Sequence, residues 1–60
     1  MFCLVDNEYN NIWGFYEDLK AAQDAQKEQN TPSYYRIEEV QNVSKYFDDN
    51  GKLIKQRFEG

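Results

Sequence analysis

The stretch FCLVDNEYNNIWGFY, residues 2–16, decides the fold. It opens with a short apolar run at residues 2–5 and closes with a second run, residues 12–16, that mixes β-branched and aromatic side chains. Between them, residues 6–11 are rich in Asp and Asn, whose side chains bond their own backbone and tolerate left-handed conformations. Two strand-like runs around such a turn predict an antiparallel β-hairpin.

A helix is predicted directly after this hairpin. Residues 19–29 have high helix propensity and contain no β-branched residue. Leu19, Ala22 and Ala25 recur at a spacing of three, which places them on one face, and small alanine side chains let a helix lie close to a sheet. Two acidic residues before the helix can cap its N-terminus, and Pro32 ends it.

The next region is ambiguous in its periodicity. Residues 34–37 look like the start of a strand, but the apolar residues between Ile37 and Phe47 also fit the stripe of a second helix over residues 34–48. A continuous strand needs a bulge or break near residues 38–39. We favour a β-hairpin in which Asn50-Gly51 forms a two-residue turn.

The register of that hairpin explains the preference. Asp49 pairs with Lys52, and the apolar residues on both sides of the turn then fall opposite one another. The register places four large apolar side chains on one face, namely Val43, Phe47, Ile54 and Phe58.

The predicted fold is therefore α+β: a small antiparallel sheet in the order ββαβ, followed by a C-terminal β-hairpin, with one helix packed on one face. Sixty residues make one domain, residues 1–60. A chain of this length buries only about 60% of the surface that its unfolded form exposes, so its stability is marginal without a staple or a partner. Its one cysteine, Cys3, excludes an intramolecular disulfide.

Three segments carry a family resemblance: IWGFY at residues 12–16, LKAA at residues 19–22 and YRIEEV at residues 35–40. In order and wording they resemble the small uncharacterised β-hairpin–helix–strand proteins of bacteria and their phages, over residues 2–43. The resemblance implies the α+β fold and a phage-like origin. It assigns no catalytic residue to this chain.

Charge and composition exclude several functions. The net charge is −4, and residues 1–30 carry all of it, with six acidic residues against two lysines. Such a chain repels phosphate backbones overall. No histidine, glycine-rich phosphate loop or nucleophile–base pair is present, so we expect neither catalysis nor a cofactor or metal. The N-terminus has no basic start and no long apolar run, which predicts a cytoplasmic protein without a membrane segment.

Ten aromatic residues are more than one helix can cover, so we expect part of them at the surface. In a regular strand Trp13 and Phe15 share one face. Aromatic residues are also enriched at protein interfaces. The sequence predicts a non-enzymatic protein-binding module with contacts from Trp13, Phe15, Tyr34 and Tyr46 and charge steering from Asp24 and Glu28.

The expected partner is another protein, encoded by a host cell. The specific hypothesis is a phage-type inhibitor of a host nucleic-acid-handling or defence protein. Two alternatives stay open. One is self-assembly, in which a homodimer also answers the small size. The other, which ranks directly after protein binding although the net charge opposes it, is a single-stranded nucleic-acid binder that uses the C-terminal hairpin. Its cations would be Arg36, Lys45, Lys55 and Arg57.

Overall fold

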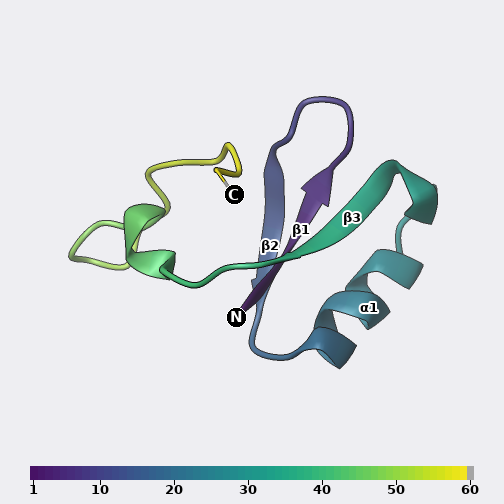
Figure 1. Cartoon of the computed structure of the whole chain (residues 1–60), viewed down its shortest axis with the longest axis horizontal. Coiled ribbons are helices and arrows are strands. Elements are labelled where there is room, and N and C mark those ends of the chain that lie inside the picture. The colour runs from purple at the N-terminus through teal and green to yellow at the C-terminus, as the bar shows by residue number, and fades with distance from the viewer. Residues whose placement is uncertain (60) are drawn as a thin grey trace.

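A computed structural model describes residues 1–59. These residues form three strands and one α-helix: β1 (Phe2–Asp6), β2 (Ile12–Tyr16), α1 (Leu19–Lys27) and β3 (Tyr35–Glu39). The strands make one antiparallel sheet in the order β2-β1-β3, which Figure 1 shows with α1 beside it. The predicted small α+β fold with an antiparallel sheet and one helix is confirmed.

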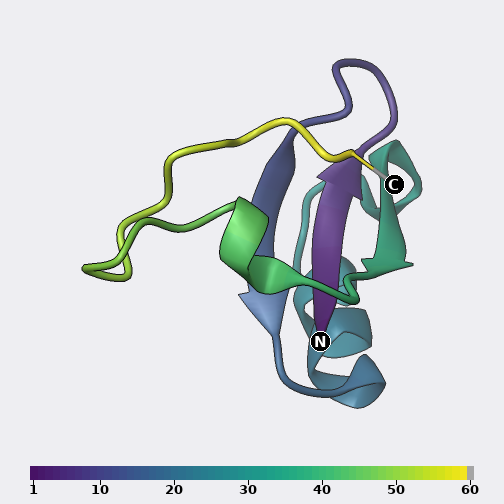
Figure 2. The same ribbon diagram turned by 60° about the vertical axis from the view of Figure 1, so that its left-hand side comes forward.

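The central strand β1 is buried on both of its faces. Cys3 and Val5 point to one face, while Leu4 between them points to the other, and all three are buried. Figure 2 shows α1 on one side of the sheet and the C-terminal segment, residues 40–59, on the other. Ala22 is the fully buried residue of α1, which agrees with the close helix–sheet approach that its small side chain allows.

The C-terminal segment completes the hydrophobic core on the second face. Its residues Val40 and Tyr46 are buried against Cys3, Val5 and Ile12 of the sheet. Further apolar side chains pack around this cluster while remaining half-buried, namely Phe15, Val43, Phe47 and Phe58. The protein thus covers this face of the sheet with its own C-terminal segment.

The predicted C-terminal hairpin is wrong in register and forms no regular strands. Phe47 pairs with Leu53 in an isolated bridge, so the loop between Asp48 and Lys52 has three residues instead of two. The Asp48 N–H donates to the Lys52 carbonyl at 2.9 Å, and the Gly51 N–H donates to the Asp48 carbonyl at 3.0 Å. With Gly51 at a φ of 79°, this is a type I turn followed by a left-handed glycine bulge.

The cause of the shifted register is the Asp48 side chain. Its carboxylate accepts hydrogen bonds from the N–H groups of Asn50 and Lys52, each at 2.9 Å, which favours the longer loop. In this register Leu53, rather than Ile54, lies opposite Phe47, and Ile54 is 64% exposed. The alternative of a second helix over residues 34–48 is also wrong, since Tyr35–Glu39 forms β3.

A β-bulge changes which residues of β2 share a face. Val5 pairs with Ile12 and Leu4 with Gly14, so Trp13 is an extra residue in β2. Ile12 and Phe15 consequently lie on the same face, toward the C-terminal segment. The prediction that Trp13 and Phe15 share a face is therefore wrong.

Candidate functional site

Three aromatic rings form a continuous surface at the end of the sheet near the β1–β2 loop. Trp13 lies edge-to-face against Tyr35, with ring centroids 6.1 Å apart, and Tyr35 lies edge-to-face against Tyr34 at 5.1 Å. Trp13 is 60% exposed, while the two tyrosines are half-buried. We call Trp13, Tyr34 and Tyr35 the aromatic patch. Tyr9, which is 63% exposed, stands in the adjoining loop.

Trp13 is held in place by a buried carboxylate. Its indole Nε1–H donates to Oδ2 of Asp6 at 3.1 Å, and Asp6 is only 1% exposed. The same carboxylate accepts hydrogen bonds from the backbone N–H groups of Tyr9, Asn10 and Asn11. Burial by itself raises the pKa of Asp6, but these hydrogen bonds outweigh it and hold the pKa below its usual value. One ionised side chain thus organises both the loop and the Trp13 ring.

Tyr34 is tied to a second carboxylate. Its hydroxyl donates to Oε2 of Glu8 at 3.0 Å. Burial raises the pKa of Tyr34, and the Glu8 carboxylate raises it further, to about 12. The Tyr34 hydroxyl therefore stays protonated at physiological pH and remains a hydrogen-bond donor to Glu8.

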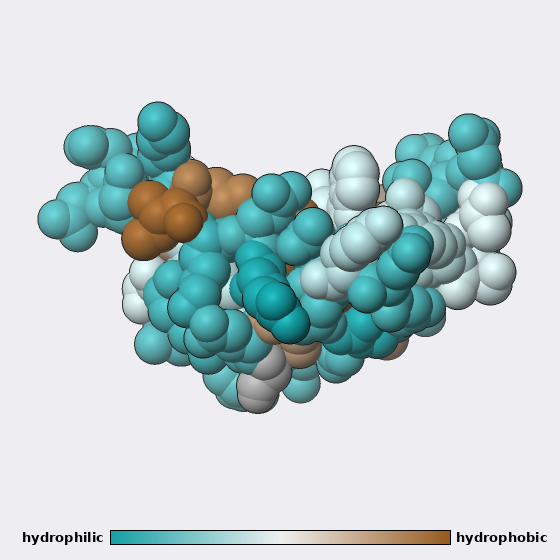
Figure 3. Space-filling view, turned by 90° about the horizontal axis from the view of Figure 1, so that it is seen from above, coloured by the Kyte–Doolittle hydropathy of each residue, from teal (hydrophilic) through white to brown (hydrophobic). Residues whose placement is uncertain are grey.

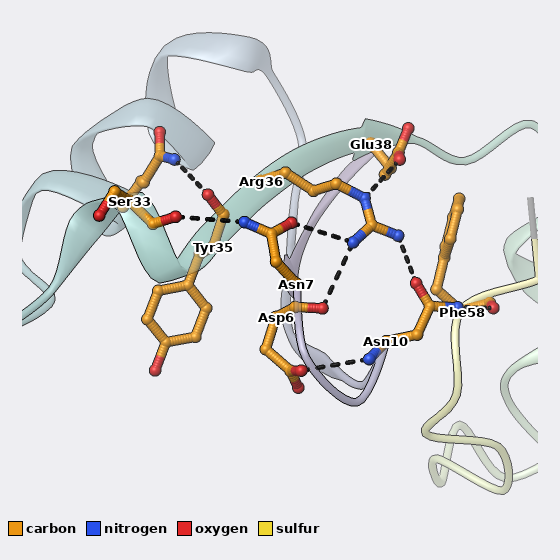
Figure 4. Close-up of polar contacts among 9 residues, drawn as sticks. Asp6, Asn7, Asn10, Ser33, Tyr35, Arg36, Glu38 and Phe58 are labelled. Carbon is orange, nitrogen blue, oxygen red and sulfur yellow. Dashed lines mark hydrogen bonds and ion pairs between the residues drawn. The ribbon is translucent and has the colours of Figure 1, made fainter.

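Arg36 connects the β1–β2 loop to β3 (Figure 4). Its guanidinium donates to Oε2 of Glu38 at 2.7 Å, to Oδ1 of Asn7 at 3.2 Å and to the side-chain oxygen of Asn10. Asn10 in turn holds the C-terminal segment, because it exchanges hydrogen bonds with the main chain of Phe58 at 2.7 and 2.8 Å. Arg36 therefore has a structural role in docking the C-terminal segment.

The predicted contact residues divide between two places. Trp13 and Tyr34 come together in the aromatic patch. Phe15 lies on the opposite face, 5.8 Å from the Tyr46 ring and 5.0 Å from the Phe47 ring. Tyr46 has no exposed surface, so it belongs to the core and is unavailable for direct contact with a partner in this structure.

The two predicted steering acids, Asp24 and Glu28, are exposed on or beside α1. Asp24 pairs with Lys20 at 3.2 Å, so its charge is partly balanced one helical turn away. Glu28 is the C-cap residue of α1. Both acids remain accessible to a partner.

The predicted cations lie toward the C-terminus, apart from Arg36. Lys55 forms an ion pair with Glu59, and the Lys45 ammonium donates to the Glu59 carbonyl at 3.1 Å. The hydrogen bond and the charge of Lys55 lower the pKa of Glu59, and the nearby Lys45 and Arg57 add to this effect. The three C-terminal cations surround an acid, and the Tyr46 ring beside Lys45 is buried. The ring beside Arg36 is Phe58, which is half-buried against the core. Exposed rings for stacking single-stranded nucleic acid are therefore not brought together with these cations in residues 1–59.

A second exposed apolar area lies far from the aromatic patch. Leu53 and Ile54 are exposed on the loop where the C-terminal segment projects, and Figure 3 shows hydrophobic surface at that end of the molecule. Two flexible aliphatic side chains without a neighbouring polar anchor make a poorer recognition surface than fixed rings. This pair instead provides a matched control for experiments on Trp13.

The predicted protein-contact residues did not include Tyr35, nor the carboxylates of Asp6 and Glu8 that bond to the patch. Tyr35 reaches Trp13 only because the bulge turns the indole away from Phe15. The one available signal was Asp6 at the end of an apolar run and before an Asn-rich loop, since an aspartate there commonly accepts loop N–H groups.

Within residues 1–59, no group of three or more His, Cys, Asp or Glu side chains is arranged to hold a metal ion. No helix in that part of the chain has the length and apolar content needed to cross a membrane. Comparisons with protein-family models, with curated proteins and with solved structures find no match for this chain. The resemblance to small bacterial and phage proteins therefore stays a prediction.

Proposed function

We propose that this chain is a non-enzymatic protein-binding module whose contact surface is the aromatic patch. The observation that carries the proposal is Trp13, a large ring that is 60% exposed although its indole N–H is bonded to the buried carboxylate of Asp6. The chain covers the opposite face of its sheet with its own C-terminal segment but leaves this ring uncovered.

A fixed aromatic ring is a favourable anchor for a partner. Burying a tryptophan removes about 150–250 Å² of surface from water. Ordering a flexible side chain on binding costs about 0.5–1.5 kcal/mol, and the hydrogen bond to Asp6 reduces that cost because it holds the ring in the free protein. Tryptophan and tyrosine are also frequent among the residues that dominate binding energy.

A more specific form of this proposal is an inhibitor of a host nucleic-acid-handling or defence protein. The acids on the solvent side of α1, Asp24 and Glu28, would steer such a basic partner during approach. Charge steering of this kind acts mainly on the association rate and weakens as salt rises.

Affinity capture from a host-cell lysate, with matched variants of the chain as baits, tests the proposal. The baits are the natural chain, Trp13→Ala, and Ile54→Ala as the control for loss of an exposed apolar side chain elsewhere. We expect at least one protein that binds the natural chain and Ile54→Ala but not Trp13→Ala. The interaction is then repeated with purified protein, and the emission of Trp13, the only tryptophan in the chain, reports binding directly.

Two controls make the result interpretable. Far-UV circular dichroism establishes that Trp13→Ala keeps the fold, and Trp13→Phe retains a ring without the indole N–H. The proposal fails if every captured protein binds Trp13→Ala as well as it binds the natural chain. It also fails if capture follows the Ile54 substitution instead.

A further inference from the structure

We infer that the aromatic patch recognises a cationic side chain, arginine or lysine, presented by the protein partner. This inference rests on the proposed protein-binding function and adds the chemistry of the group that is bound. It follows from two carboxylates, the buried Asp6 and the exposed Glu8, that accept hydrogen bonds from rings of the patch.

The two carboxylates change the electron density of the rings that bond to them. The Trp13 indole N–H donates to the Asp6 carboxylate at 3.1 Å, and the Tyr34 hydroxyl donates to the Glu8 carboxylate at 3.0 Å. A hydrogen bond from a ring N–H or O–H to an anion polarises the donor and makes the ring face more negative. Negative ring faces attract cations, and tryptophan is the best ring for this purpose.

The negative charge of Glu8 beside the patch is not balanced by an ion pair within residues 1–59. The ion pairs within residues 1–59 join Lys20 to Asp24, Arg36 to Glu38 and Lys55 to Glu59, and Glu8 takes part in none of them. The guanidinium of Arg36, the cation nearest in the fold to the loop, is already bound by Glu38 and the loop amides (Figure 4). The described part of the chain thus leaves the carboxylate beside Tyr34 without a cation.

Three occupants of the patch can be compared: a second copy of this chain, an apolar side chain and a cationic side chain. In a dimer formed through this face, the Asp6 and Glu8 carboxylates of one copy would approach those of the other. Repulsion between these like charges opposes self-association here. An apolar side chain would gain contact area but no compensation for Glu8. A cation on the patch is attracted by the ring faces, and the Glu8 carboxylate at the Tyr34 end of the patch adds an opposite charge. A positively charged side chain therefore fits the patch best.

The test uses a pair of peptides of nearly identical shape. The natural chain is titrated with acetyl-Gly-Arg-Gly-amide and with the same peptide carrying citrulline, which is neutral, in place of arginine. The indole N–H resonance and the emission of Trp13 report binding at the patch. We expect the arginine peptide to bind at least about twofold more tightly, the lower end of what a cation–π contact gives at an exposed site.

Two substitutions locate the effect. Glu8→Gln is expected to reduce the preference for arginine over citrulline, whereas Glu17→Gln, which removes the same charge at an exposed position elsewhere, leaves it unchanged. Lower arginine affinity of both variants by the same factor would indicate general electrostatics and would overturn the inference. Equal binding of the two peptides, or no response of Trp13 to either, would overturn it as well.

Failure here is separable from failure of the proposed function. If the capture experiment finds a partner that depends on Trp13 while the arginine peptide shows no preference, protein binding stands and the cationic partner does not. A concentration-dependent dimer in sedimentation that is abolished by Trp13→Ala would assign the patch to a second copy and refute the inference.

Discussion

Replacing Tyr46 tests whether the C-terminal segment is an integral part of the core. Tyr46 has no exposed surface, its ring lies 5.8 Å from that of Phe15, and its hydroxyl accepts the Glu59 N–H at 2.9 Å and donates to the Glu59 carbonyl at 3.2 Å. Tyr46→Ala removes both the ring and these hydrogen bonds. Tyr46→Phe removes the hydrogen bonds alone.

The magnitudes follow from these contacts. Truncation of a buried aromatic ring to alanine costs about 3–5 kcal/mol of unfolding free energy. A chain of 60 residues has about 3–9 kcal/mol in total, so Tyr46→Ala should remove at least about a third of the stability. Tyr46→Phe should cost about 1 kcal/mol, because water can replace the hydroxyl at the exposed Glu59 main chain.

Urea denaturation followed by far-UV circular dichroism measures these differences. Ile54→Ala serves as the control, because Ile54 is 64% exposed in the same segment and its truncation should change stability by no more than about 0.5 kcal/mol. If Tyr46→Ala lowered the unfolding free energy by less than about 1 kcal/mol, the Tyr46 ring would not be an integral part of the core, because truncation of a buried aromatic ring costs about 3–5 kcal/mol.

Three further predictions follow from single residues. Burial, with a contribution from Glu38, raises the pKa of the Cys3 thiol to about 11, so a thiol reagent at pH 8 should modify it at the rate of strand opening and rapidly only in urea; immediate modification of the native chain would contradict this. The pKa of Asp6 is lowered in the folded chain, so its stabilising effect is fully present at pH values above the unfolded pKa of about 3.9 and is lost as pH falls through the folded pKa. Acid titration of the unfolding free energy should show this loss. Asp6→Asn should make the unfolding free energy depend less on pH in the same range. Gly51 has a φ of 79°, so Gly51→Ala should destabilise by about 1 kcal/mol in urea melts through backbone strain, because an added Cβ meets no neighbour within 4 Å; unchanged stability would show that this loop relaxes freely.

The elements that local patterns determine were predictable. The hairpin of β1 and β2 follows from two apolar runs around an Asp- and Asn-rich loop, and α1 from a long stretch without β-branched residues. Asp18 caps α1 by accepting from the Ala21 N–H at 2.8 Å, as its position before the helix indicates. These features depend on neighbours in sequence.

Hydrophobic periodicity did not predict the bulge in β2 or the register of the C-terminal loop, and an aspartate stands beside each of these features. The Asp6 carboxylate accepts hydrogen bonds from N–H groups of the β1–β2 loop, next to the bulge that turns Trp13 away from Phe15. The Asp48 carboxylate accepts hydrogen bonds from N–H groups of the three-residue loop in the C-terminal segment. The bulge and the changed register each shift the pairing by one residue, which hydrophobic periodicity cannot detect. The aromatic patch depends on the first of these shifts, so only Trp13 and Tyr34 of it were predicted.

The covering of the second sheet face was also beyond local reasoning. It brings Tyr46 against Cys3 and Val5 across about forty positions of sequence. The surplus of aromatic residues was noticed, but part of it is taken up by the chain's own C-terminal segment. Trp13, which is turned away from that face, stays 60% exposed, and Tyr9 in the β1–β2 loop is 63% exposed.

The most direct test of the account is the mobility of the Trp13 indole, measured by ¹⁵N relaxation at Nε1 in the free protein. Because the chain has one tryptophan, the resonance needs no assignment. The bond to Asp6 predicts an order parameter of about 0.85, that of a rigid backbone, although the ring is exposed. An order parameter below about 0.6 would mean that the ring moves freely and that the chain holds no fixed docking anchor.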